Sequence, residues 1–147
     1  MTRARASYDV TARSAAPAEK VFALLADSAG WSEWAGPMVV RSWWEREGSP
    51  EPGGVGAIRR LGLGKLSSRE EIVEYDAPRH LAYVWLTKFP VRDYRADVRL
   101  EPDGAGTRIV WTGSFVPAFP GGGAVMSRLL AMAVGGFAKR LAVQAER

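Results

Sequence analysis

The sequence predicts an α+β domain in which an antiparallel sheet packs against a long C-terminal helix. Three observations predict it: short helical segments follow a first strand, six successive segments then alternate with a period of two, and the final segment has helical periodicity. The chain has 147 residues, 47% of them hydrophobic, so we expect one domain, residues 1–147, with a complete core.

The N-terminal third predicts one strand and two short helices. Residues 3–12 alternate weakly and form the expected first strand. Ser14 suits the N-cap of the first helix, with Pro17 in its first turn. After the break at Gly30, Trp31 and Trp34 are spaced to share one face of a second, shorter helix.

Six further strands are expected after Pro37, because apolar and polar residues alternate and turn-forming residues separate the runs. They are Met38–Trp44, Val55–Leu61, Leu66–Tyr75, Leu81–Phe89, Asp93–Leu100 and Thr107–Val116. The last three alternate most clearly. Their expected inner residues are Leu81, Tyr83, Trp85, Tyr94, Ala96, Val98, Leu100, Ile109, Trp111, Gly113 and Phe115.

The C-terminal segment, Ala124–Arg147, predicts one long helix. Its apolar residues follow helical spacing at Met126, Leu129, Leu130, Ala133, Phe137 and Leu141. The pair Gly135 and Gly136 in its middle costs about 1 kcal/mol per glycine relative to alanine. Arg128 and the length of the apolar run argue against a transmembrane helix.

Composition excludes several classes of function. The sequence has no cysteine and one histidine, His80, which argues against disulfides, thiolate chemistry and imidazole-rich metal sites. The N-terminus lacks the apolar run of a secretory signal, so we expect a cytoplasmic protein. The net charge is +4, but arginines alternate with acidic residues, which favours a solvated face over a nucleic-acid site. A steep salt dependence of binding to DNA or RNA would reverse that interpretation.

Several short motifs, taken in order, resemble a known superfamily over essentially the whole chain. They are the segment Ser14–Phe22, the Trp31 and Trp34 pair, the strands Gly54–Arg59 and Glu70–Asp76, the turn and strand Gly106–Trp111, and the segment Phe115–Gly123. This order is similar to the START-like, Bet v 1-like (SRPBCC) superfamily, and within it to the polyketide cyclase/dehydrase and lipid-transport group. The resemblance implies the helix-grip fold, a curved seven-stranded sheet around the C-terminal helix with an apolar cavity between them. It implies function weakly, because the fold hosts cyclases, hydrolases, lipid carriers and receptors.

Aromatic and apolar residues are the expected ligand contacts. If the inner strand residues face the cavity, they lie opposite the C-terminal helix, and Trp31 and Trp34 lie at an entrance beside the loop Gly121–Gly123. The alternative is that these side chains simply pack on one another. The ligand-binding residues expected are Trp31, Trp34, Trp85, Trp111, Phe115, Met126, Leu129, Met132, Ala133 and Phe137.

A charge pair is the expected catalytic element. Arg59 and Glu70 lie on strands joined by the turn Gly62–Lys65, and both match polar cavity positions of the resembled family. Buried together, they must pair, and they would then orient a ligand oxygen, with Tyr83 or Tyr94 as proton donor. The alternative is a cross-strand pair on the solvated face. If the register is shifted by one residue, the candidates are Arg69 and Glu71.

The sequence therefore predicts a protein that binds a hydrophobic or aromatic small molecule, acting as a polyketide cyclase/dehydrase-like enzyme without a cofactor or metal. The alternative is a noncatalytic carrier or sensor of lipids or hydrophobic metabolites. We expect no nucleic-acid partner, no integral membrane segment, and a monomer or homodimer. His80 is expected to be an exposed turn residue rather than a catalytic one.

Overall fold

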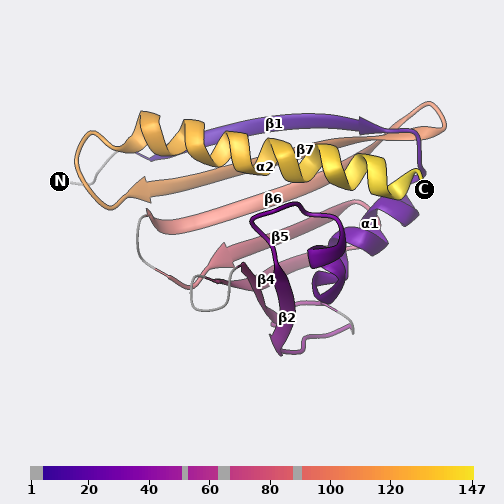
Figure 1. Cartoon of the computed structure of the whole chain (residues 1–147), viewed down its shortest axis with the longest axis horizontal. Helices are drawn as coiled ribbons and strands as arrows, with labels where there is room; N and C mark the ends of the chain where they lie inside the picture. Colours follow the sequence, from indigo (N-terminus) through magenta and orange to yellow (C-terminus); the bar gives the residue numbers. More distant parts are fainter. Residues whose placement is uncertain (1–4, 51–52, 63–66, 88–90) are drawn as a thin grey trace.

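Seven strands form one antiparallel sheet in a computed structural model that describes residues 5–50, 53–62, 67–87 and 91–147. The order across the sheet is β1-β7-β6-β5-β4-β3-β2, so each strand from β2 to β7 pairs with its neighbour in sequence and β1 joins at the β7 edge (Figure 1). The strands are β1 Ala6–Ser14, β2 Arg41–Arg46, β3 Ile58–Gly62, β4 Ser68–Asp76, β5 His80–Trp85, β6 Val91–Asp103 and β7 Gly106–Pro117. The predicted α+β architecture is confirmed.

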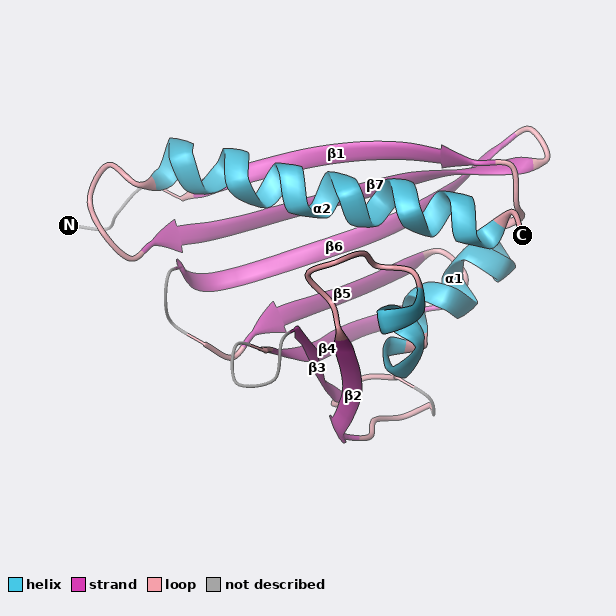
Figure 2. Ribbon diagram, in the orientation of Figure 1, coloured by secondary structure: helices cyan, strands magenta, loops and turns pink. Residues whose placement is uncertain are grey.

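Three helices complete the fold. The α-helix α1 spans Ala18–Ala26, the 3₁₀ helix η1 spans Ser28–Glu33, and the long helix α2 spans Gly123–Ala145. Helix α2 runs along β1 and β7 on one face of the sheet, and α1 lies near the C-terminal end of α2 (Figure 2). No helix in the described ranges is long and apolar enough to cross a membrane.

The start of α1 differs from the prediction. Its N-cap is Pro17, without a side-chain cap, whereas Ser14 is the last residue of β1. The Ser14 hydroxyl donates to the carbonyl oxygen of Ala142 at 2.8 Å, so it ties the end of β1 to α2. Ser14 pairs with Thr107 in the sheet, and it lies four residues before Ala18, where α1 begins. It therefore cannot cap that helix.

The expected inner faces of β5, β6 and β7 are confirmed, since the predicted inner residues are buried except for the half-buried Trp85. One irregularity was not predicted. The pairing of β6 with β7 shifts between Arg92 and Arg95, and Asp93 has a φ of 51°. In a regular strand, residues three positions apart point to opposite faces. Because of the bulge, Val91 and Tyr94 both lie on the inner face.

Helix α2 packs on the sheet through a different face from the one predicted. Its buried side chains are Leu130, Val134, Ala138, Leu141, Ala142 and Ala145. The prediction that Leu129 and Met132 face the sheet is wrong, because Leu129 is 54% exposed and Met132 is 75% exposed. The helix approaches the sheet along a row at four-residue spacing that includes small alanines, which turns the larger neighbours Leu129 and Met132 outward.

Candidate functional site

A buried ion pair lies on the inner face of β3 and β4. Arg59 and Glu70 are register partners, and Arg59 Nε donates to Glu70 Oε1 at 2.8 Å. Arg59 is 0% exposed and Glu70 is 5% exposed. The expected pair and register are therefore confirmed, and the alternative pair Arg69 and Glu71 does not occupy this position. The connecting turn at 63–65 lies outside the described residues.

Both members of the pair have further partners. Glu70 Oε2 accepts hydrogen bonds from Trp85 Nε1 at 2.9 Å and from Ser68 Oγ at 3.2 Å. The guanidinium of Arg59 lies 4.4 Å from the ring centroids of both Trp31 and Tyr83. These contacts hold the arginine between two aromatic faces and leave the carboxylate with donors on both oxygens.

A cavity of about 240 Å³ opens beside Glu70, and we call it the inner cavity. Its walls come from the segment before β2, from β3 to β6, and from the middle of α2. It is lined by Met38, Val39, Leu61, Gly62, Ser68, Glu70, Tyr83, Trp85, Tyr94, Leu130, Ala133, Val134 and Phe137. Polar side chains are confined to the sheet wall, and the helix wall is apolar.

Six of the predicted site residues line the inner cavity together. They are Glu70, Tyr83, Trp85, Tyr94, Ala133 and Phe137. Arg59 is absent from the lining and lies behind Tyr83, so it reaches the cavity only through Glu70. The expectation that Arg59 itself orients a ligand is therefore not supported by its position.

The other predicted contacts lie elsewhere. Trp31, Trp111 and Phe115 are at most 1% exposed and belong to the core, and Met126 packs against that core. Trp31 and Trp34 are in contact with ring centroids 4.8 Å apart, as their spacing predicts. Their placement at an entrance is wrong, because the first and second short helices pack both indoles inward.

The inner cavity adjoins an apolar groove of about 500 Å³ on the protein surface, which we call the outer groove. The groove is lined by Ala35, Pro37, Met38, Leu129, Met132, Ala133, Phe137 and Arg140. Met38, Ala133 and Phe137 line both spaces, so they form the boundary between them. Leu129 and Met132, the two outward-facing helix residues, thus lie on the approach to the cavity.

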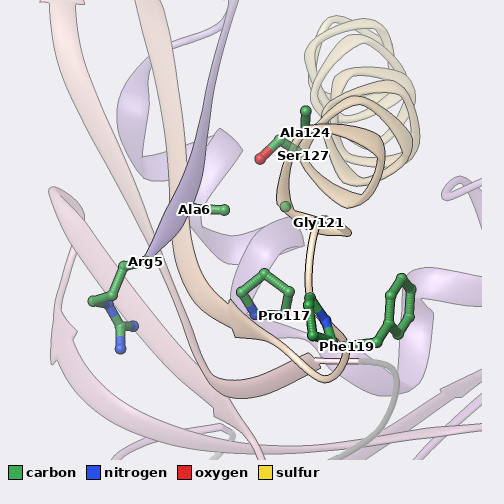
Figure 3. Close-up of a pocket in the computed structure, with 9 residues that line it drawn as sticks. Arg5, Ala6, Pro117, Phe119, Gly121, Ala124 and Ser127 are labelled. Atoms are coloured by element: carbon green, nitrogen blue, oxygen red, sulfur yellow. The ribbon is translucent and has the colours of Figure 1, made fainter. Parts of the chain in front are cut away.

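The loop Gly121–Gly123 is not this approach. It lines a separate hollow of about 620 Å³ at the start of α2, together with Arg5, Pro117 and Phe119 (Figure 3). None of the residues of this hollow lines the inner cavity. The predicted entrance at the glycine run is therefore wrong, because β7 delivers this loop to the opposite end of α2 from Arg140.

The hydroxyls of Tyr83 and Tyr94, which line the inner cavity, belong to a buried cluster that also includes Tyr8, a residue that sequence analysis missed and that does not line the cavity. The hydroxyl of Tyr8, on β1, makes a short hydrogen bond with that of Tyr94. Trp111 Nε1 donates to the Tyr83 hydroxyl oxygen at 3.3 Å. Tyr8 shares parity with Val10 and Ala12 on the first strand, and its register partner is Gly113. The available signal in the sequence was this shared parity, whereas the pairing with Gly113 is known only from the structure.

Burial raises the pKa of all three phenols. For Tyr83 the main cause is loss of solvation, and the negative charge of Glu70 raises the pKa further. For Tyr94 and Tyr8, burial comes first and the neighbouring Tyr83 second. The three hydroxyls therefore stay protonated near neutral pH and act as hydrogen-bond donors or acids rather than as bases.

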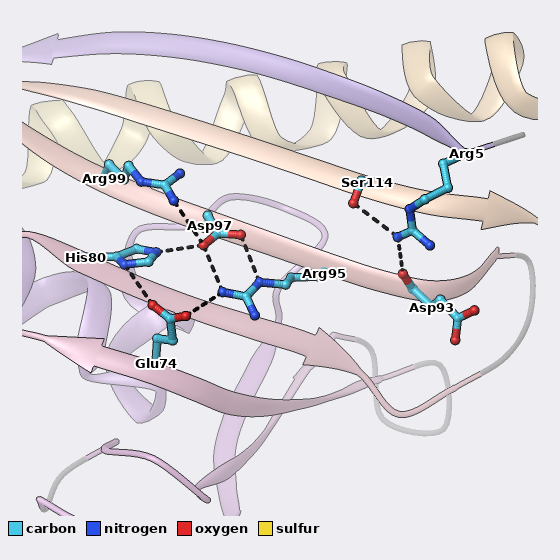
Figure 4. A network of polar contacts seen from close by, with 8 residues as sticks. All are labelled: Arg5, Glu74, His80, Asp93, Arg95, Asp97, Arg99 and Ser114. Carbon is cyan, nitrogen blue, oxygen red and sulfur yellow. Dashed lines mark hydrogen bonds and ion pairs between the residues drawn. The ribbon is translucent and has the colours of Figure 1, made fainter.

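His80 lies on the opposite face of the sheet, in a network of charged groups (Figure 4). Its Nε2 is 2.7 Å from Asp97 Oδ2, and its Nδ1 is 3.0 Å from Glu74 Oε2. The candidate ligand atoms of these three residues lie within 4.8 Å of one another, close enough to bind a metal ion. Arg95 already binds both carboxylates, through Nε at 3.1 Å and Nη2 at 2.8 Å. His80 is half-buried rather than exposed as predicted, and it takes no part in the inner cavity.

Comparisons with solved structures find the same fold. An aromatase/cyclase, Zhui, from Streptomyces sp. R1128 has a TM-score of 0.77 at 22% identity, covering 98% of this chain and 95% of that one. A START superfamily protein from Mycobacterium smegmatis has a TM-score of 0.79 at 15% identity, covering 96% and 97%. A norcoclaurine synthase point mutant from Thalictrum flavum, in complex with a transition-state analogue, has a TM-score of 0.77 at 12% identity, covering 99% and 96%.

A search of curated proteins found no match. The family model described as polyketide cyclase / dehydrase and lipid transport matches residues 5–146, nearly the whole chain. This match shows that the chain belongs to the polyketide cyclase/dehydrase and lipid-transport family.

Proposed function

We propose that the protein binds a hydrophobic or aromatic small molecule in the inner cavity. The observation that carries this proposal is that the two spaces adjoin, because Met38, Ala133 and Phe137 line both the outer groove and the inner cavity. A ligand could slide between these residues from an apolar surface to a chamber with aromatic walls. The polar atoms at the sheet wall would then fix its orientation.

The chemistry that this site suits best is a cofactor-independent cyclisation or dehydration of a carbonyl compound. A phenol of Tyr94 or Tyr83 would donate to a ligand carbonyl oxygen and make its carbon more electrophilic. In an aldol closure, Glu70 would take a proton from the carbon that attacks, the new carbon–carbon bond would form, and the tyrosine proton would pass to the developing alkoxide. The proton held by Glu70 would then return to the tyrosine phenolate and restore both groups. Arg59 acts as a positioning residue, because it holds the carboxylate in place from behind.

The second candidate is a noncatalytic carrier or sensor, and one observation favours it. Glu70 already accepts hydrogen bonds from Arg59, Trp85 and Ser68. Each of these donors occupies an acceptor position of the carboxylate, so fewer positions remain to take a proton from a ligand. A carrier needs only the apolar chamber, whereas the enzyme needs Glu70 to accept a proton.

Binding is tested with the uncharged probe N-phenyl-1-naphthylamine, whose fluorescence rises in an apolar site. Ala133→Phe places a ring at the boundary of the two spaces, and we expect it to weaken probe binding by at least about tenfold. The matched control is Lys139→Phe, on the same helix but at an exposed position outside both spaces. Equal affinity of the two variants would contradict binding in the inner cavity.

Catalysis is tested with a short linear poly-β-ketone ester, by following cyclised and dehydrated products by chromatography. We expect Tyr94→Phe to lower the rate by about 100-fold, within the range for a lost general acid, while probe affinity stays within a few-fold of wild type. Product formation at the uncatalysed rate in the wild-type protein, with binding intact, would favour the carrier.

A further inference from the structure

The charge of the inner cavity can be derived from the hydrogen bonds of Glu70. A carboxylate offers about four acceptor positions. Three are taken by Arg59 Nε at 2.8 Å, Trp85 Nε1 at 2.9 Å and Ser68 Oγ at 3.2 Å. All three partners donate to the Glu70 carboxylate, so among the described residues one acceptor position remains. That position suits a hydroxyl or enol donor on a ligand.

The positive partner of this carboxylate cannot receive a ligand anion. Arg59 is fully buried, and its guanidinium lies 4.4 Å from the centroids of Trp31 and Tyr83. Its Nη2 has no hydrogen-bond partner among the described residues, but this nitrogen is buried and Arg59 is not part of the cavity lining. The ion pair is therefore a dipole whose negative end faces the cavity.

The phenols beside Glu70 complete a neutral recognition surface. The Tyr8 and Tyr94 hydroxyls share one hydrogen bond in which either oxygen can be the donor. When Tyr8 donates, the Tyr94 proton remains for a ligand in the cavity. The Tyr83 oxygen accepts from Trp111, and the Tyr83 hydroxyl also interacts with those of Tyr94 and Tyr8, so a ligand would replace one of these neighbours as acceptor of its proton. A neutral carbonyl oxygen on a ligand is a suitable acceptor for either proton.

The environment of the tyrosines also disfavours added negative charge. Burial and the Glu70 carboxylate raise the pKa of Tyr83, because together they destabilise its phenolate more than the Arg59 charge stabilises it. The same two causes would destabilise the carboxylate of a ligand placed beside Tyr83. The lining residues of the inner cavity include no lysine, arginine or histidine that could compensate it.

From these observations we propose that the inner cavity selects uncharged ligands that carry a hydroxyl or enol group beside a carbonyl, and that it rejects carboxylates of the same shape. Glu70 is the specificity-determining residue. Its free acceptor position takes the ligand hydroxyl, and Tyr94 or Tyr83 donates to the carbonyl oxygen. This inference rests on the proposed binding of a hydrophobic ligand in the inner cavity.

The test uses two compounds of nearly equal shape at pH 7. 2-Acetyl-1-naphthol is neutral, whereas 1-hydroxy-2-naphthoate has a carboxylate in place of the acetyl group. Affinities are measured by displacement of N-phenyl-1-naphthylamine and by calorimetry. We expect the ketone to bind at least about tenfold more tightly than the carboxylate.

The variants assign the selectivity to Glu70. In Glu70→Gln the preference for the ketone should shrink, mainly because the carboxylate binds more tightly. Since this change leaves Arg59 buried without its partner, the double variant Arg59→Met/Glu70→Gln is measured as well, with thermal unfolding to check the fold. Glu101→Gln, the same change at an exposed position that does not line the cavity, is the matched control and should keep the wild-type ratio.

The outcomes separate the two proposals. Tighter binding of the ketone that depends on Glu70 supports the inference. Equal binding of both compounds, or tighter binding of the carboxylate, overturns the inference while ligand binding stands. If neither compound nor the probe binds, the proposed function itself is overturned, and the selectivity with it.

Discussion

The ring of Tyr8 crosses Gly113, its register partner on β7, and this crossing brings the Tyr8 hydroxyl to that of Tyr94 on β6. A β-carbon at position 113 would overlap the Tyr8 ring. Gly113 is therefore needed for space, and the contact between β1 and the base of the inner cavity depends on it.

Gly113→Ala should force the Tyr8 ring aside and break its hydrogen bond to Tyr94. We expect the free energy of unfolding to fall by about 1–3 kcal/mol, the usual cost of adding a methyl group to a packed site. Urea unfolding measures the change. A variant as stable as wild type would show that the ring moves without cost.

Gly135→Ala is the matched change in an open site and should have the opposite sign. A β-carbon at Gly135 would meet only Val10 Cγ1, at 3.9 Å, which is an ordinary contact. Because alanine favours a helix interior over glycine, we expect a gain of about 1 kcal/mol in the free energy of unfolding. A loss of stability in the same urea experiment would contradict the packing described for α2.

Arg59→Met should be strongly destabilising, because it leaves Glu70 buried without its positive partner. We expect a loss of about 3–5 kcal/mol in the free energy of unfolding. Arg59→Met/Glu70→Gln removes both charges and should recover a large part of that loss. A double variant no more stable than the single one would mean that the aromatic contacts of Arg59, not its charge pair, dominate its role.

The ion pairs of Glu45 with Arg60 and Arg69 predict that stability depends on pH. Hydrogen bonds from Arg69, at 2.5 and 2.9 Å, and from Arg60, at 3.1 Å, lower the pKa of Glu45 to about 2. Below its ordinary value of 4.5, the unfolded chain therefore binds a proton at Glu45 that the native state does not. The stabilisation by Glu45 is present above pH 4.5 and should be lost as the pH falls toward 2.

Glu45→Gln measures that contribution. Urea unfolding between pH 2 and 6 should give a shallower fall in stability for the variant than for wild type, and the two curves should converge at the acid end. Asp9→Asn is the control, because no hydrogen bond or ion pair is found for the Asp9 side chain in the described structure. Parallel curves for wild type and Glu45→Gln would contradict the shift.

Much of the fold could be predicted from the sequence because short-range patterns determine it. Alternation in β5, β6 and β7 placed Tyr83, Tyr94 and Trp111 on the inner face, and parity made Arg59 and Glu70 the candidates for the pair that the structure shows. These predictions hold because successive side chains of a strand point to opposite faces whatever the strand packs against.

Two local features escaped the same reasoning. The bulge at Asp93 shifts the register within β6, and the sheet-facing side of α2 is the row of Leu130 and Val134 rather than that of Leu129 and Met132. Apolar residues occur on both sides of this helix. Its orientation is therefore set by which side chains are small enough for close approach to β1, and that depends on the partner surface.

The sequence by itself determined the order of the elements and the inner faces of β5, β6 and β7, and it made Arg59 and Glu70 candidates for a pair whose register the structure then settled. Only the tertiary structure decided that Glu70 faces the inner cavity while Arg59 lies behind it, and that Tyr8 joins Tyr94 from the far edge of the sheet. The physical reason is distance along the chain. Parity and spacing act over a few residues, whereas the cavity is built where strands and a helix from distant segments meet.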